Sequence, residues 1–374
     1  MPDTHSFEGT VRASSQLAGP VDPAELQPGT SRRSARARRI SGGIWLLGFV
    51  LFAVLPFWLP GLGIGDAEGD LYTASLVAIG AVFASGVSFT IGWSGVANFG
   101  AQLSYGAGAY VVADLAALHA FEDFILLLVC GALVGLGMAL VQSIFIGEKT
   151  GFAFGMITLA LGQLAYLFVN QTSYLYGTNG IAGVPRGSIF GFDLASSVQF
   201  YLATVVCVAL TILVVGWLRR TVLGRSLAAA RQDPRRALAV GLPTRRCKII
   251  GLCVGGFIAG LAGGLYAMAV GVVDPSLFGW TMGAAPVLAG LVGGIGTLGG
   301  PVIGAVIYQV LSTGLATVTT SYVLWTGLVT LVIFMLFPGG LVTVGRQLHG
   351  DRLISLYRDG WRRIHREAAP RGHE

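Results

Sequence analysis

Long apolar runs recur along this chain and constrain its fold more than any other feature. A helix that crosses the hydrocarbon core of a membrane needs about 20 predominantly apolar residues. Candidate spans of roughly that kind are 41–60, 71–91, 103–120, 124–146, 152–170, 198–217, 248–273, 282–295, 301–318 and 321–338. The pattern predicts an all-α integral membrane protein with about ten transmembrane spans. The eighth span is short and rich in Gly, which is typical of a broken helix.

The composition supports a membrane location. Of the 374 residues, 11% are charged and 54% are hydrophobic, whereas a soluble domain has about 25% charged residues. Glycine occupies 56 positions, and glycine lets the backbones of membrane helices approach closely. Most of the chain is therefore expected to lie in lipid. The four cysteines have no metal-ligand spacing, so no metal site is predicted.

Basic residues gather in three stretches outside the apolar runs. The stretch 1–40 holds six Arg, 219–248 holds nine basic residues against one acid, and 346–374 holds seven Arg. Lys and Arg accumulate in cytoplasmic loops. Alternation of the spans from a cytoplasmic N-terminus leaves only Arg186 of the 24 basic residues outside. We therefore expect both termini to be cytoplasmic, and we do not interpret the basic stretches as a nucleic-acid site.

This distribution divides the chain into three regions. Residues 1–40 are polar and lack apolar periodicity, which predicts a disordered basic cytoplasmic tail. Residues 41–345 form the predicted transmembrane domain, with the cytoplasmic loop 219–248 inside it. Residues 346–374 form a second basic cytoplasmic tail.

Two segments are too rich in glycine and polar residues for ordinary lipid-facing helix. Residues 91–110 read IGWSGVANFGAQLSYGAGAY, and residues 290–304 read GLVGGIGTLGGPVIG. Irregular backbone at membrane depth lies against protein or a water-filled cavity. Gly-interrupted segments in two halves of a chain indicate a transport pathway, whereas close helix packing is the alternative. We expect 91–110 to line a cavity, and both interpretations stay open for 290–304.

Five polar residues are candidates for the pathway, because their side chains could replace the water that a substrate loses at membrane depth. They are Ser94, Asn98, Gln102, Thr158 and Asn179. Hydrogen bonding between helices is the alternative role for each. Asn179 belongs to a predicted external loop, 171–190, that either gates the outer mouth or connects two spans. Asp114, the one ionisable residue well inside an apolar stretch, either serves the pathway or lies at the outer interface.

The cytoplasmic loop 219–248 contains a predicted short helix. Asp233 suits the N-cap and Pro234 the first helical position, while Gly241 suits the position just past a helix end. Residues 234–240 are therefore expected to form a helix about 10 Å long. It either docks a partner or belongs to a solvated basic loop that only sets topology. The side chains it would present are Arg235, Arg236 and Leu238.

Motifs for chemistry within this chain are weak or absent. No Gly-Lys dipeptide occurs, so the chain has no P-loop, and active transport would need an ATPase from another chain. Residues 92–95, Gly-Trp-Ser-Gly, resemble the nucleophile motif of intramembrane serine proteases. That chemistry needs a His beside Ser94, and only His119 is near a span. We predict that the chain is not an enzyme, with the hydrolase kept as an alternative.

Several stretches in one order resemble the LivM-like permease subunits of branched-chain amino-acid ABC transporters. The resemblance covers residues 70–345. The stretches that carry it are 92–110, 151–183, the run from Gly224 to Tyr266, 290–305 and Phe337-Pro338-Gly339-Gly340.

The resemblance implies a set of partners and a location. It implies a second, LivH-like permease subunit, two cytoplasmic ATP-binding subunits and an extracytoplasmic substrate-binding protein in a prokaryotic cytoplasmic membrane. This chain would bind no cofactor, and the partner subunits would hydrolyse ATP. The segment 225–248 would be the loop that docks in an ATPase groove. The family's positions in this loop fall on Ala230, Asp233, Ala237 and Gly241.

The function implied is import of branched-chain amino acids or a related small polar solute. Two departures from the family pattern touch the presumed pathway: the first at Asn98-Phe99-Gly100 or Ser104-Tyr105-Gly106, and the second at Thr178-Asn179-Gly180. Urea, short amides and carboxylic acids therefore stay as alternative substrates. An ATP-independent channel or facilitator is the alternative mechanism.

Overall fold

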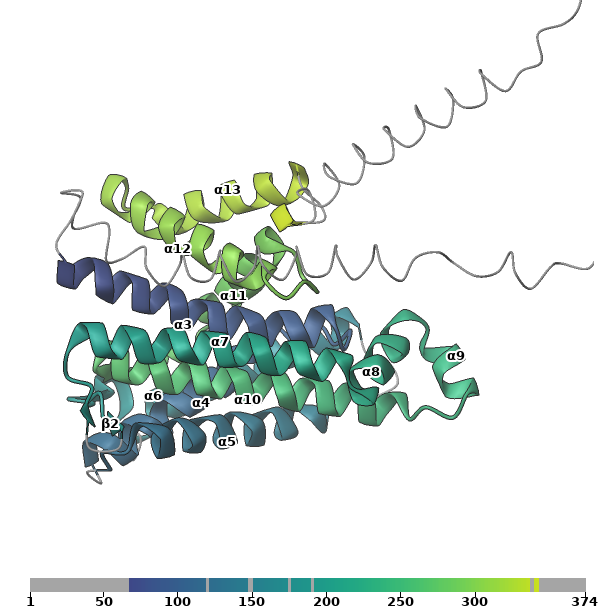
Figure 1. Cartoon of the computed structure of the whole chain (residues 1–374), viewed down its shortest axis with the longest axis horizontal. Helices are drawn as coiled ribbons and strands as arrows, with labels where there is room; N and C mark the ends of the chain where they lie inside the picture. The colour runs from purple at the N-terminus through teal and green to yellow at the C-terminus, as the bar shows by residue number, and fades with distance from the viewer. Residues whose placement is uncertain are drawn as a thin grey trace, which may run out of the picture. The chain divides into compact units, whose positions relative to one another are not determined.

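The computed structural model describes residues 67–118, 121–146, 151–173, 176–189, 192–336 and 340–342. The predicted span 41–60 and the predicted tails 1–40 and 346–374 lie outside these residues. Most of the described chain is helical (Figure 1). The α-helices are α3 (Ala67–Gly92), α4 (Ala101–Ala113), α5 (Phe124–Ser143), α6 (Phe152–Gln171), α7 (Ser197–Arg220), α8 (Val222–Gln232), α9 (Pro234–Ala239), α10 (Thr244–Val270), α11 (Trp280–Gly293), α12 (Gly300–Val318) and α13 (Tyr322–Leu336).

Five of the described helices are long and apolar enough to cross a membrane, namely α3, α5, α6, α7 and α10. Three further apolar helices, α11, α12 and α13, are shorter. Each predicted span from 71–91 onward coincides with a helix, within a few residues at its ends. These helices confirm an all-α polytopic fold, but they do not confirm the count of ten spans.

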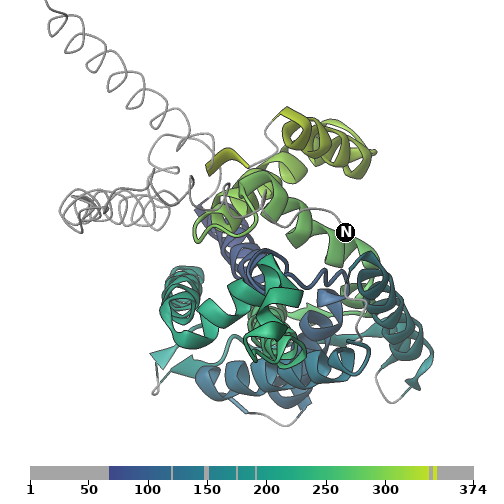
Figure 2. The same ribbon diagram turned by 90° about the vertical axis from the view of Figure 1, so that its right-hand side faces the viewer.

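Helix α10 packs against α3, α4 and α5, and these helices run side by side (Figure 1). Figure 2 views them nearly end on. Glycine makes the packing close: a Cβ atom on Gly135 of α5 would lie 2.6 Å from the Cα of Gly260 on α10. Such contact between backbones is what small residues provide in membrane helices.

The two Gly-rich segments are both breaks between helices. The first break, residues 93–100, separates α3 from α4, and the second, residues 294–299, separates α11 from α12. The first is shorter than the predicted segment 91–110, because residues from Ala101 onward are helical. Helix α4 continues into a short π-helix, Asp114–Leu118, so Asp114 lies at a change of helical geometry.

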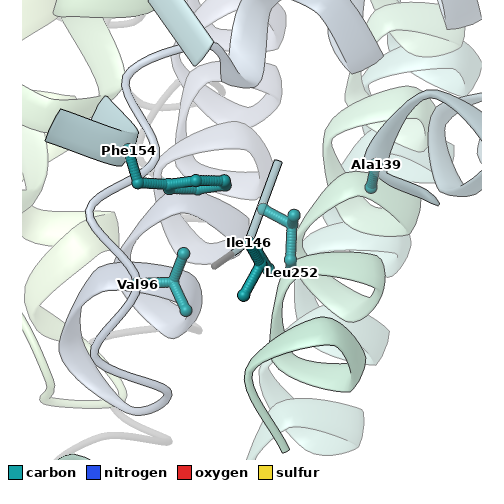
Figure 3. Packing of buried hydrophobic residues seen from close by; sticks show 5 residues of the cluster. All are labelled: Val96, Ala139, Ile146, Phe154 and Leu252. Carbon is teal, nitrogen blue, oxygen red and sulfur yellow. The ribbon is translucent and has the colours of Figure 1, made fainter. Parts of the chain in front are cut away.

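Side chains from three helices hold the first break in place (Figure 3). Val96, which lies in the break and is fully buried, belongs to an apolar cluster with residues of α5, α6 and α10. The other members of this cluster are Ala139, Ile146, Phe154 and Leu252. The irregular backbone is thus packed against protein, as its burial at membrane depth requires.

At the opposite end of α10 the chain forms short strands. Strand β1 (Ile181–Ala182) pairs antiparallel with β4 (Val272–Val273), and β2 (Ser188–Ile189) pairs antiparallel with β3 (Phe192–Asp193). After β4 a 3-10 helix, η5 (Pro275–Phe278), packs against α4 and α6.

Helix α11 follows η5 and is only 14 residues long, which corresponds to about 21 Å. It is therefore shorter than the hydrocarbon core of a bilayer, about 30 Å. This agrees with the expectation of a broken eighth span. Pro286 lies inside α11, where it provides no backbone N–H for the helix.

Helices α8 and α9 lie beyond the ends of α7 and α10 (Figure 1). The carboxylate of Asp233 accepts hydrogen bonds from the backbone N–H groups of Arg235, at 3.0 Å, and Arg236, at 3.1 Å. The predicted short helix is confirmed with this cap, and it ends one residue earlier than expected. Helix α8 was not predicted; the side chain of Thr221 caps it by accepting from the N–H of Gly224.

Candidate functional site

The two helix breaks meet each other and helix α8 at one place. We call this place the junction and define it by Gly92, Trp93, Arg219, Arg231 and Gly296. Gly92 ends α3, Arg219 lies in the last turn of α7, Arg231 lies in the last turn of α8, and Gly296 lies in the second break. Residues far apart in the sequence therefore connect four elements.

Two hydrogen bonds attach α8 to the first break. The indole Nε1 of Trp93 donates to the carbonyl oxygen of Gly224 at 2.8 Å, and the guanidinium of Arg231 donates to the carbonyl oxygen of Gly92. The last carbonyls of a helix have no partner within it and carry a partial negative charge. The cationic side chain of Arg231 gives the last carbonyl of α3 a hydrogen-bond partner and also balances its partial negative charge.

Arg219 attaches α7 to both breaks. Its Nη1 donates to the carbonyl oxygen of Gly296 at 3.2 Å, and its Nη2 donates to that of Thr297 at 3.4 Å. Its guanidinium carbon also lies 4.6 Å from the ring centroid of Trp93. A cation–π contact of this kind contributes about 0.5–2 kcal/mol. One side chain therefore links α7 to residues that lie in different breaks.

The end of α3 also touches the second break through its backbone. A Cβ atom on Gly92 would lie 2.5 Å from the backbone nitrogen of Gly296, which is closer than a Cβ atom can approach. The contact therefore requires a glycine at position 92. Since the arginine contacts and this backbone contact share the same residues, the two breaks form a single connected unit with α8.

The face of α9 that was predicted to bind a partner is exposed. Leu238 is 58% exposed and the adjacent Val240 is 75% exposed, and both lie next to the exposed Arg235 and Arg236. Arg236 forms an ion pair with Asp233 at 2.9 Å, and its side chain is 90% exposed. Apolar and cationic side chains therefore share one solvent-facing surface on α9.

The four loop positions that the family resemblance implies determine the path of the α8–α9 segment and do not belong to the exposed face of α9. Ala230 and Ala237 are buried, at 1% and 4% exposure. Asp233 caps α9, and Gly241 has a φ of +80°, in the left-handed region that favours glycine. These residues fix the path of the chain, while Arg235, Arg236 and Leu238 remain available to a partner.

Among the five pathway candidates, Ser94 and Asn98 have partners within the first break and its surroundings. The hydroxyl of Ser94 donates to the carbonyl oxygen of Thr90 at 2.6 Å. The side chain of Asn98 accepts from the N–H of Gly100 at 2.9 Å and donates to Oε1 of Gln142 at 3.2 Å. Both side chains are buried and stabilise the break.

Thr158 and Asn179 lie apart from each other. The hydroxyl of Thr158 donates to the carbonyl oxygen of Gly155 at 2.9 Å and accepts from the N–H of Phe99 at 3.3 Å, so it ties α6 to the first break. Asn179 is exposed in the 3-10 turn Gly177–Asn179. The structure thus groups Ser94, Asn98 and Thr158 around the first break and leaves Asn179 outside this group.

Gln102 differs from the other four candidates. It lies in the first turn of α4 and is 0% exposed, yet neither its amide oxygen nor its amide nitrogen has a hydrogen-bond partner among the residues that the structure describes. A buried amide without a partner costs about 1–3 kcal/mol. The sequence places Gln102 among the polar residues of 91–110 but contains no signal that separates it from them.

A cavity of about 260 Å³ lies among α3, α4, α10, α11 and α12. Apolar side chains line most of it, and no Asp, Glu, Lys or Arg is among its lining residues. The largest and the most polar lining side chains are Phe83, Tyr105, Tyr266, Tyr308 and Gln309. The cavity is somewhat smaller than the usual pocket for a drug-sized ligand, about 300–1,000 Å³.

Sequence reasoning missed the residues that form the junction. It counted Arg219 and Arg231 only as topology-setting charges, and it considered Trp93 only as part of the sequence Gly-Trp-Ser-Gly. One signal was available: Trp93 and Gly92 stand at the start of the first Gly-rich segment, and Gly296 stands in the second. Two breaks that interact need a connection, but the sequence does not indicate which arginines provide it.

The long apolar helices and their packing define a multi-pass membrane protein. Residues 71–338 match the family described as the permease component of branched-chain amino acid transport systems. Because this match covers more than half of the chain, the chain belongs to that family. The resemblance seen in the sequence is thereby confirmed.

Individual relatives carry different solutes. The chain is 25% identical over 272 residues to the high-affinity branched-chain amino acid permease protein LivM of Escherichia coli, covering 65% of this chain and 63% of the relative. It is 26% identical over 305 residues to the L-arabinose permease protein AraH of Azospirillum brasilense, covering 78% and 85%. It is 26% identical over 252 residues to LivH of Salmonella typhimurium, covering 62% and 79%.

The chain spans about 63% of the length of the LivM protein that it matches. LivM and LivH are permease proteins of branched-chain amino acid transport systems, and AraH is a permease protein of an L-arabinose ABC transporter. The family therefore establishes the class of this chain as a membrane permease component, while substrate and partners are matters of proposal.

Proposed function

We propose that this chain is the membrane-spanning subunit of an ABC importer that carries a branched-chain amino acid or a related small solute. The junction carries this proposal. It connects an exposed helix, α9, through α8 to the first break, and Arg219 of α7 connects the first break to the second. An energy source outside the membrane needs such a connection to change the shape of the spanning helices.

In the proposed mechanism, α9 docks on a separate ATPase subunit through Arg235, Arg236 and Leu238. ATP binding by two such subunits moves the α8–α9 segment. Arg231 and Trp93 transmit the movement to the first break, and Arg219 transmits it to the second. The substrate crosses without chemical change, and this chain itself binds no cofactor.

The remaining parts of the proposal concern orientation and partners. The α8–α9 end faces the cytoplasm of a prokaryote, and the end with β1 and β4 faces outward, where a substrate-binding protein delivers the solute. Both chain termini are then cytoplasmic. A second, LivH-like permease subunit completes the pathway; the likeness of this chain to LivH as well as LivM supports a pair of related subunits.

Purification of the tagged chain with its native partners tests this proposal. We expect a second permease and two P-loop ATPases by mass spectrometry, and we expect ATP-driven uptake of labelled leucine, isoleucine or valine after reconstitution into liposomes. Replacement of Arg235, Arg236 and Leu238 by Asp should release the ATPases, because three acidic side chains remove the basic and apolar surface.

A different result would favour a passive facilitator. In that case the chain would purify without ATPases and would move solute in liposomes that contain no ATP. Transport would then also persist in the triple Asp variant, and the importer proposal would be wrong.

A further inference from the structure

Gln102 holds an amide group between two glycines of opposing helices. A Cβ atom on Gly162 of α6 would lie 2.5 Å from Nε2 of Gln102. A Cβ atom on Gly283 of α11 would lie 2.6 Å from Cδ of the same side chain. The absence of side chains at these two positions leaves room for the amide, which fills the contact between α6 and α11.

The contrast with a second buried glutamine shows that this arrangement is unusual. Gln142 is also 0% exposed, but its Nε2 donates to the carbonyl oxygen of Gly100 at 2.7 Å, and its Oε1 accepts from Asn98. Gln102 has neither kind of bond within the described residues. Buried polar groups are normally paired, so an amide without a partner requires an explanation other than helix packing.

Gln102 does not line the cavity described above, but residues near it on α4 and near Gly283 on α11 do. Tyr105, which lines the cavity, follows Gln102 by one helical turn on α4, and Met282 and Pro286, which also line it, flank Gly283 on α11. An apolar space with aromatic walls therefore lies one helical turn from an amide whose nitrogen can donate and whose oxygen can accept.

We propose that Gln102 is the polar contact of the substrate site, which the closed contact of α6 with α11 hides in this conformation. The inference rests on the proposed function and deepens it by naming the site. When α11 moves away from α6, the amide N–H group donates to a carboxylate oxygen and the amide oxygen accepts from an ammonium group. The apolar part of the solute enters the cavity.

The site so formed selects a chemical class. No charged residue lines the cavity, so a strongly charged solute would be buried without a counter-ion, which is costly. A zwitterion with an apolar side chain presents both a donor and an acceptor to one amide. The class is therefore a small α-amino acid with an aliphatic or aromatic side chain.

The first experiment compares two matched variants of the intact complex in liposomes, Gln102→Met and Gln142→Met. The probes are labelled leucine, isoleucine and valine. We expect Gln102→Met to assemble and to lose uptake about tenfold, the effect of one hydrogen-bonding group. We expect Gln142→Met to reduce assembly, because it leaves two partners unpaired. Uptake by Gln102→Met at the wild-type rate would overturn the proposal.

A second experiment does not depend on the substrate or on the Met variant. Gln102→Cys is placed in a complex in which Cys130, Cys207, Cys247 and Cys253 are replaced by Ala. A small methanethiosulfonate reagent should label the introduced thiol at least about tenfold faster during ATP hydrolysis than at rest. A tenfold change in the fraction of molecules with an exposed thiol needs only a modest shift in the equilibrium between the two conformations. Equal rates in the two states would overturn the proposal.

Comparison of the wild-type complex with Gln102→Met distinguishes failure of this inference from failure of the proposed function. If the wild-type complex lacks ATPases or ATP-driven uptake, the importer proposal fails and takes this inference with it. If the wild-type complex transports the amino acids while Gln102→Met does so equally well, only the assignment of Gln102 fails.

Discussion

The guanidinium of Arg219 stacks on the indole of Trp93, with 4.6 Å between its central carbon and the ring centroid. The same guanidinium donates to carbonyl groups of the second break, whereas Trp93 belongs to the first. One side chain of α7 therefore contacts both breaks. Movement of α7 relative to α3 should therefore disturb contacts of both breaks, whereas movement of α8 acts directly on the first.

Replacement of Arg219 by Ala should uncouple transport from ATP hydrolysis. The variant loses the contact with Trp93, which contributes about 0.5–2 kcal/mol, and two charge-assisted hydrogen bonds, which contribute about 1.5–3 kcal/mol each. We expect uptake to fall while ATP hydrolysis by the complex continues, measured as the ratio of solute imported to ATP hydrolysed. Arg220→Ala is the matched control, because Arg220 is the exposed neighbour in the same helix. An unchanged ratio in Arg219→Ala would show that the junction does not couple ATP hydrolysis to transport.

Introduction of a side chain at Gly92 should destabilise the protein. A Cβ atom there meets the backbone of Gly296 and the side chain of Ile295, and overpacking of this kind costs about 1–3 kcal/mol. Thermal unfolding of the detergent-solubilised chain measures the change. Gly137→Ala in α5 is the control, since nothing lies within 4 Å of its Cβ position. It should stabilise its helix slightly, and a similar loss in both variants would contradict the prediction.

Loss of the cap of α9 should weaken attachment of the ATPase. Asp233→Ala removes the acceptor for two backbone N–H groups, which costs about 1 kcal/mol of helix stability. We expect less ATPase to co-purify with this variant. Asp233→Asn keeps a capping oxygen but removes the charge, and it should behave like the wild type because the exposed ion pair with Arg236 contributes little. If both variants lost the same amount of co-purified ATPase, the effect would be due to the charge of Asp233 and not to its capping oxygen.

A methyl group at Gly180 should open the pairing of β1 with β4. Gly180 has a φ of +65°, and its Cβ position lies against the backbone of Val273 and Asp274. This backbone conformation costs a non-glycine residue about 1–3 kcal/mol. We expect Gly180→Ala to increase proteolysis of the 176–189 segment. Gly183→Ala shares the positive φ but meets nothing within 4 Å, so a difference between the variants isolates the contact with β4.

Helix positions were the most predictable part of the fold. The predicted spans 71–91 and 152–170 correspond closely to α3 and α6, because uninterrupted apolar length is a local property of the sequence. The cap at Asp233 was predictable for the same reason. Helix α8 was missed because it is short and lies within the basic stretch 219–248, and its inner face is buried against the rest of the chain at Leu227 and Ala230.

The candidate site was less predictable than the helices. Gln102, Ser94 and Asn98 have similar character in the sequence, and only the arrangement of α6 and α11 distinguishes the amide without a partner from those with one. The contacts of Arg219 join residues 77 and 78 positions apart. A hydrophobicity pattern contains no information about which carbonyl group a distant guanidinium reaches.

Helix α9 buries only Ala237 among its six residues. Its exposed side chains make no contribution to the junction, so they can change without disturbing the connection between α8 and the breaks. The residues that select the ATPase subunit and the residues that select the solute are therefore separate in this chain. Exchange of α9 for that of a related permease should redirect the transporter to another ATPase and leave its selectivity as it was.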